Sequence, residues 1–135
     1  MQTCPCGNSR PFPQCCEPAI LGDTLAASAE ALMRSRYCAY VLENWRYLYK
    51  TWHPQTRPTR KELSRSESTQ WLRLEIVKTE GGGHQDTHGT VEFIAHFRLG
   101  SEAHSLHEVS QFEKIQGKWL YVEGDILAGN TKFPR

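Results

Sequence analysis

Residues 4–16 read CPCGNSRPFPQCC and contain four of the five cysteines in this chain of 135 residues. A disulfide between Cys4 and Cys6, or between Cys15 and Cys16, would close a ring too small for ordinary disulfide geometry. Metal ligation has no such restriction, because two thiol pairs joined by one tight loop supply the four sulfur ligands of a closed zinc site. We therefore expect these four cysteines to bind one zinc ion, with an iron–sulfur cluster or a redox switch as alternatives.

The surrounding segment, residues 1–22, supports a metal-dependent structure. It is rich in proline, glycine and cysteine and has no periodic hydrophobic residues that could form a core. A structural zinc ion supplies folding free energy directly, so such a segment is ordered by its metal. Within it, Arg10 either offsets the negative charge of a zinc–tetrathiolate site or is an ordinary exposed loop residue.

The overall charge and hydropathy indicate the class of protein. Sixteen basic and fifteen acidic residues give a formal net charge of +1, which argues against a protein whose main role is to hold DNA or RNA backbones. The N-terminus lacks the pattern of a signal peptide, and no apolar run is long enough to span a membrane. We expect a soluble cytoplasmic protein, and in that reducing compartment clustered thiols are metal ligands or redox groups rather than disulfides.

Helical patterns occupy the first half of the chain after the cysteines. Apolar residues recur at steps of three and four from residue 25 to about residue 43, which predicts a long helix with Asp23 or Thr24 as its N-cap. Asn44 is placed to cap a second, short helix over residues 45–52. Thr59 and Glu62 have the spacing of a capping box and predict one further turn of helix.

In the second half of the chain, apolar and polar residues alternate with the two-residue period that is typical of β-strands. Alternating patterns predict strands over residues 69–80, 91–99, 103–115 and 118–125, with Leu72, Leu74 and Ile76 on one face of the first and Trp71 on the other. Glycine-containing turns join successive strands. Helices followed by hairpin-linked strands predict an α+β fold with an antiparallel sheet and the helices packed on one face.

Several local strings resemble known families. Cys4-Pro5-Cys6-Gly7, then a basic residue, an aromatic residue and Cys15-Cys16, resemble the SEC-C motif, a zinc-binding module named after the carboxyl terminus of the SecA translocase. The motif usually has Gly-Ser-Gly where this chain has Gly7-Asn8-Ser9. Further matching strings lie at residues 32–37, 51–54, 91–93, 107–112 and 119–124, and together they resemble the YchJ-like proteins, small bacterial proteins of unestablished function.

The resemblance implies a domain organisation and a cavity. Residues 1–22 would form the SEC-C motif, residues 23–128 an α+β domain of the nuclear transport factor 2 (cystatin-like) type, and residues 129–135 a tail. In that domain a curved antiparallel sheet wraps a long N-terminal helix and leaves a cone-shaped cavity. We expect the cavity to be lined by the polar and aromatic side chains of Arg36, Trp52, Arg57, Glu92, Glu108 and Ser110.

The remaining polar residues give weaker signals. His107 and Glu108 are adjacent on a strand and therefore point to opposite faces, so we assign no catalytic residue. A buried Glu108 would need a partner, and Arg36 or Arg57 is the expected one. Cys38, in the middle of a helix, is expected to be a small buried thiol without chemistry.

Two further clusters have simple interpretations. His84, Asp86 and His88 lie in a glycine-flanked hairpin loop, which we interpret as a solvated loop rather than as a second metal site. The basic run at Arg57, Arg60, Lys61 and Arg65 is interpreted as a solvated face, with contact to ribosomal RNA as the alternative.

Two functions from different classes follow. The first is a non-catalytic zinc protein whose knuckle docks on a protein partner, an export chaperone or the ribosome, through Arg10, Phe12 and Gln14. The alternative is small-molecule binding, or an isomerase or hydratase activity, in the cone-shaped cavity, with the zinc purely structural. A thiol redox sensor is a third interpretation. The chain is expected to be a monomer or a homodimer paired through the outer sheet face.

Overall fold

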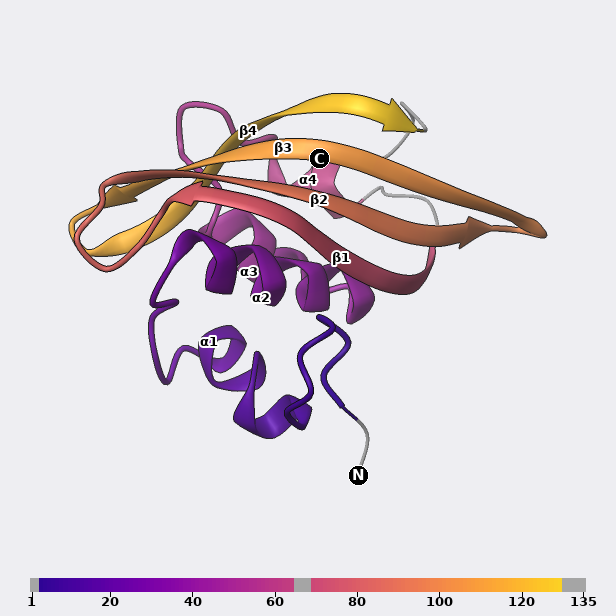
Figure 1. The fold of residues 1–135 in the computed structure, drawn as a ribbon, viewed down its shortest axis with the longest axis horizontal. Coiled ribbons are helices and arrows are strands. Elements are labelled where there is room, and N and C mark those ends of the chain that lie inside the picture. Colours follow the sequence, from indigo (N-terminus) through magenta and orange to yellow (C-terminus); the bar gives the residue numbers. More distant parts are fainter. Residues whose placement is uncertain (1–2, 65–68, 130–135) are drawn as a thin grey trace.

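A helical layer separates the N-terminal cysteine segment from one antiparallel sheet in the computed structural model, which describes residues 3–64 and 69–129. Figure 1 shows the N-terminal segment on the side of the helices that faces away from the sheet. The elements are η1 (Phe12–Gln14), α1 (Glu17–Leu21), α2 (Ala29–Val41), α3 (Trp45–Lys50), α4 (Arg60–Ser64), β1 (Gln70–Gly81), β2 (His88–Leu99), β3 (Glu102–Ile115) and β4 (Lys118–Gly129). The strands follow the chain in the order β1-β2-β3-β4, so the predicted α+β class with an antiparallel sheet is confirmed.

The long helix predicted from residue 24 is shorter than expected. Helix α2 has 13 residues and begins at Ala29, where the Ser28 hydroxyl accepts a hydrogen bond of 3.0 Å from the Ala31 N–H. The predicted caps, Asp23 and Thr24, instead donate their backbone N–H groups to the Pro18 carbonyl. They belong to the turn that ends α1, because the preceding glycine adopts a left-handed conformation that closes that helix.

The start of α2 is fixed by the hairpin between β1 and β2. The Ala29 N–H donates a hydrogen bond of 3.0 Å to the Gly82 carbonyl. Gly82 has a φ of +78°, and a Cβ on Gly89 would collide with the Gly82 backbone. The glycine run therefore allows two backbone segments and a helix terminus to meet closely, which no other residue type would permit.

The two predicted caps of the shorter helices are confirmed. The Asn44 side chain accepts a hydrogen bond of 3.0 Å from the Tyr47 N–H at the start of α3. Thr59 and Glu62 exchange the two reciprocal bonds of a capping box, at 2.9 and 3.1 Å. Helix α3 ends at Lys50, before the predicted end at residue 52, because the chain there turns to pair with Tyr121 of β4.

Bulges change which residues of the sheet face the core. Trp71 pairs with Phe97 and Arg73 with His96, so Leu72 is an extra residue in β1 and is 44 % exposed. Since a bulge shifts the side-chain alternation, Trp71 lies on the same face as Leu74, and the prediction that Leu72 shares a face with Leu74 is wrong. Two similar irregularities occur between β3 and β4, and β4 continues to Gly129, beyond the predicted end at residue 125.

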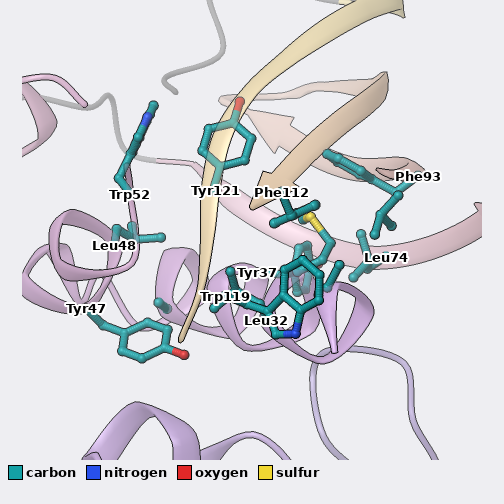
Figure 2. Close-up of a cluster of buried hydrophobic side chains, with 14 of the residues drawn as sticks. Leu32, Tyr37, Tyr47, Leu48, Trp52, Leu74, Phe93, Phe112, Trp119 and Tyr121 are labelled. Carbon is teal, nitrogen blue, oxygen red and sulfur yellow. The ribbon is translucent and has the colours of Figure 1, made fainter. Parts of the chain in front are cut away.

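The core lies between the helices and the inner face of the sheet. Figure 2 shows large side chains from α2, α3 and all four strands packed together. Aromatic rings cross at close range, with 5.0 Å between the ring centres of Trp52 and Tyr121. None of the helices within residues 3–64 and 69–129 is long and apolar enough to cross a membrane.

Candidate metal centre

The four predicted ligands come together beneath α2. The sulfur atoms of Cys4, Cys6, Cys15 and Cys16 all lie within 4.8 Å of one another. Cys15 Sγ is 3.6 Å from Cys6 Sγ and 3.9 Å from Cys16 Sγ. A tetrahedral zinc ion with bonds of about 2.3 Å to sulfur separates its ligands by about 3.8 Å. The spacing therefore fits one tetrahedral ion, and all five cysteines of the chain are free thiols rather than disulfides.

The backbone of the cysteine knuckle, residues 3–16, explains how the two pairs meet. The Cys4 N–H donates to the Arg10 carbonyl at 2.8 Å and the Gly7 N–H donates to the Cys4 carbonyl at 3.2 Å. Gly7 has a φ of +97°, so glycine supplies the turn after the first pair. The short helix η1 then reverses the chain and returns Cys15 and Cys16 to the first pair.

An arginine from α2, rather than the one expected in the loop, supports this centre. Arg34 donates a hydrogen bond of 2.6 Å to the Cys6 carbonyl and pairs with Glu30 at 2.9 Å. Burial lowers the pKa of Arg34, but the hydrogen bonds to Glu30 and Cys6 outweigh it and raise the pKa overall. Arg10 is exposed, so its interpretation as an ordinary loop residue describes it better.

A fifth sulfur, that of Cys38, lies next to one of these four, although the sequence predicts a thiol without chemistry there. Cys38 Sγ lies 3.5 Å from Cys4 Sγ and the residue is completely buried. Arg34 and Cys38 are four residues apart on α2 and therefore lie on the same face of the helix. This one-turn spacing of a basic residue and a thiol is the signal that could have indicated contact with the knuckle.

The thiols alone cannot all carry charge. Hydrogen bonds from Cys16 and Cys38 hold the pKa of the Cys6 thiol far below its usual value. Burial raises the pKa of Cys4, and the hydrogen bond with Cys38 raises that of Cys16. The pKa of one thiol is thus lowered while those of Cys4 and Cys16 are raised, because closely spaced thiolates repel one another. A soft divalent cation permits several of them to ionise together, which is the chemistry of a thiolate metal site.

Three of the six predicted cavity residues meet in the second candidate site. Arg36, Glu108 and Ser110 line a cavity of about 30 Å³ between α2 and the sheet. Such a volume holds about two water molecules, whereas pockets for small-molecule ligands are typically about 300–1,000 Å³. In this structure the cavity is therefore a small void lined mostly by aromatic and other apolar side chains.

Buried hydrogen bonds organise these residues. The Arg36 guanidinium donates to the Leu48 carbonyl at 2.9 Å and to the Thr51 hydroxyl at 2.7 Å. It also lies 4.7 Å from the ring centre of Tyr121, and burial lowers its pKa. The Glu108 carboxylate accepts a hydrogen bond of 2.6 Å from Ser110, and it occupies the space that a side chain on Gly124 would fill.

The other three predicted cavity residues do not line this cavity. Trp52 is buried in the core against Tyr121. Arg57 lies over the ring of Tyr49, at 4.0 Å from its centre. Glu92 is on the outer face of the sheet, where its carboxylate lies 2.7 Å from His107 Nε2. His107 and Glu108 therefore point to opposite faces, as their adjacency predicted.

Comparison with known proteins identifies the family. A model described as "YchJ, middle NTF2-like domain" matches residues 28–124. The chain belongs to the YchJ-like family. It is 46 % identical over 134 residues to a UPF0225 protein of Ralstonia nicotianae, covering 91 % of this chain and 90 % of that one. It is 47 % identical over 124 residues to a UPF0225 protein of Streptomyces coelicolor, covering 92 % and 95 %.

Two solved structures resemble this YchJ-like chain. The solution structure of a SEC-C motif-containing protein from Rhodopseudomonas palustris has a TM-score of 0.85 and 37 % identity, covering 94 % of this chain and all of that one. A crystal structure of a SEC-C motif-containing protein from Psychrobacter arcticus has a TM-score of 0.77 and 28 % identity, covering 97 % and 86 %. The resemblance inferred from the cysteine spacing and the later strings is therefore confirmed.

The two remaining clusters of this YchJ-like chain lie on the surface. In the hairpin loop Asp86 accepts a hydrogen bond of 3.0 Å from the Gly83 N–H. Across residues 3–64 and 69–129, the four knuckle cysteines are the group of three or more side chains close enough to hold a metal ion. In the basic run, Arg57 and Arg60 both lie over the Tyr49 ring, and Arg65 is outside the described residues.

Proposed function

We propose that this chain is a zinc-binding protein whose cysteine knuckle is a docking surface for another protein. The observation that carries the proposal is the convergence of four thiols within 4.8 Å. Four protein ligands would occupy all four coordination positions of a tetrahedral zinc ion, so a bound ion would have no open position for a substrate. A closed site of this kind stabilises and shapes a surface rather than performing chemistry.

The surface beside the knuckle is suited to a peptide that is both apolar and acidic. Leu21 and Leu25 are 67 % and 61 % exposed. Leu25 also lines a hollow of about 150 Å³ that includes Arg10, Arg34 and Cys15. Exposed apolar side chains beside basic ones are typical of protein interaction sites. We propose an acidic segment of an export chaperone or of a ribosomal protein as the partner, in the reducing cytoplasm that keeps the thiols available.

The test compares two variants that each replace one exposed leucine by serine. Arg10→Ala combined with Leu25→Ser alters the docking surface, whereas Leu127→Ser removes a leucine on β4 that is 55 % exposed. Phe12 is left intact because it packs against the cysteines. Binding to purified ribosomes is measured by sedimentation and binding to a purified export chaperone by calorimetry. The proposal predicts that the first variant loses binding and the second keeps it; equal binding by both would contradict it.

The alternative function, binding or conversion of a small molecule in the cavity, has less support. The buried Arg36 and Glu108 favour a polar ligand, but the cavity of about 30 Å³ is too small for a metabolite. A thermal-shift screen against a metabolite panel separates the two functions. A strong hit that disappears in Arg36→Met would favour the cavity over the knuckle.

A further inference from the structure

The metal centre has five sulfur atoms, one more than a tetrahedral ion can bind. Four of the five cysteines are at most 4 % exposed: Cys4, Cys6, Cys16 and Cys38. The fifth, Cys15, is only partly buried and packs against the outside of this buried group. The set of four expected from the sequence therefore differs from the set of four that is most buried, by the exchange of Cys15 for Cys38.

The sulfur of Cys38 lies at the distance expected between two ligands from one of the four knuckle cysteines. Cys38 Sγ is 3.5 Å from Cys4 Sγ, close to the separation of about 3.8 Å between two sulfurs on one tetrahedral zinc ion. Cys38 also belongs to the same buried cluster as Cys4, Cys6 and Cys16. Its sulfur therefore lies among the three buried members of the expected ligand set.

We propose that Cys38 is an alternative fourth ligand of the metal ion, which binds in place of Cys15. This inference rests on the zinc-binding part of the proposed function and adds a ligand exchange to it. In the exchange the bond from the metal to Cys15 breaks and a bond to Cys38 forms. The proton that leaves the Cys38 thiol is taken up by the departing Cys15 thiolate, so the charge of the site does not change.

The supporting elements of the two residues differ in a way that favours the exchange. Cys38 is held by α2, a 13-residue helix packed against the sheet. Cys15 follows the three-residue helix η1, and its sulfur accepts a weak hydrogen bond of 3.5 Å from the Asn8 side chain. After exchange, Cys15 would be a free thiol at the edge of the hollow that contains Arg10 and Arg34.

Cobalt(II) is the probe for the first experiment, because its visible and near-ultraviolet spectrum reports tetrahedral geometry and the number of thiolate ligands. The full chain is titrated as wild type, Cys15→Ser, Cys38→Ser and the double variant. We expect Cys15→Ser to keep a four-thiolate spectrum and the double variant to lose about one quarter of the charge-transfer intensity, because three thiolates remain. A three-thiolate spectrum for Cys15→Ser, unchanged by adding Cys38→Ser, would overturn the inference.

Affinity distinguishes a ligand from a residue that merely supports one. Changes outside the ligand set reduce metal affinity by about 10–100-fold. We therefore expect the double variant to bind cobalt more than about 100-fold more weakly than Cys15→Ser, measured by competition with a chelator. Cys16→Ser, which removes a buried ligand common to both sets, is the control and should weaken binding with or without Cys38. A difference of less than 10-fold between Cys15→Ser and the double variant would contradict a ligand role.

A second measurement uses the wild-type chain and so does not depend on whether a variant folds. Zinc-loaded protein is treated with iodoacetamide, the modified cysteine is located by mass spectrometry and the retained zinc is measured. We expect Cys15 to be alkylated while the ion stays bound. Release of one zinc ion for each alkylated Cys15 would overturn the inference but not zinc binding, whereas a chain that never binds zinc or cobalt would refute the metal proposal itself.

Discussion

Arg34 joins α2 to the cysteine knuckle, and its removal should weaken metal binding. Its guanidinium donates a hydrogen bond of 2.6 Å to the Cys6 carbonyl and is held in place by Glu30. The bond requires an ordered knuckle backbone at Cys6. Because a metal ion orders that backbone, the bond and the metal should stabilise each other.

The size of the effect follows from the nature of this bond. A hydrogen bond with a charged partner contributes about 1.5–3 kcal/mol. Only 16 % of the Arg34 side chain is exposed, so solvent screens it weakly. A loss of about 2 kcal/mol corresponds to a metal Kd that is about 30-fold larger. We therefore expect Arg34→Gln to raise the zinc Kd about 30-fold, and Arg34→Lys to raise it less because the charge is kept.

The assay is a competition for zinc with a chromogenic chelator, at constant pH and ionic strength. Arg10→Gln is the matched control, because it removes the same charge from an exposed position of the knuckle. Circular dichroism and thermal unfolding check that each variant is folded. The reasoning would be refuted if Arg34→Gln bound zinc within two-fold of the wild type, or if Arg10→Gln weakened binding equally.

Three predictions concern the fold and are measured by urea unfolding. Ser28→Ala should lower the free energy of unfolding by about 1 kcal/mol because it removes the N-cap of α2; Asp23→Ala should change it by less than about 0.5 kcal/mol, and the reverse order would contradict the observed helix start. Gly89→Ala should cost about 1–3 kcal/mol through a backbone collision, and full stability would show that the hairpin is not so closely packed. Gly124→Ala should lower the free energy of unfolding by a similar amount, because its methyl group would meet the Glu108 carboxylate. This loss of stability should be smaller when Glu108 is also replaced by alanine. Strictly additive losses in the double variant would argue against the contact.

Local signals in the sequence predicted the parts of the fold that depend on neighbouring residues. The Asn44 cap and the capping box at Thr59 are set by residues three apart, and both were identified from the sequence. The side-chain alternation of β2 could also be predicted, because it depends only on residues two apart in the sequence. Helix α2 was predicted to start too early, because the apolar pattern extends into residues 25–28. The true start is set by the local cap at Ser28, which the longer apolar pattern obscured, and by a tertiary hydrogen bond from Ala29 to Gly82 that no local pattern encodes.

The parts of the site that were missed depend on contacts distant in the sequence. The four knuckle cysteines could be predicted because their spacing is a property of one short segment. Arg34 and Cys38 reach the knuckle from a helix, and 34 residues separate Cys4 from Cys38. Bulges, such as the one at Leu72, shift side chains to the other face of the sheet and cannot be read from alternation alone.

Metal content of the full chain purified under reducing conditions tests the central claim most directly. Elemental analysis combined with native mass spectrometry gives the identity of the ion and its ratio to protein. The account predicts one zinc ion per chain, lost when Cys4 and Cys16 are replaced by serine. A reduced, metal-free chain whose N-terminal segment still resists proteolysis as well as the metal-loaded chain would contradict it.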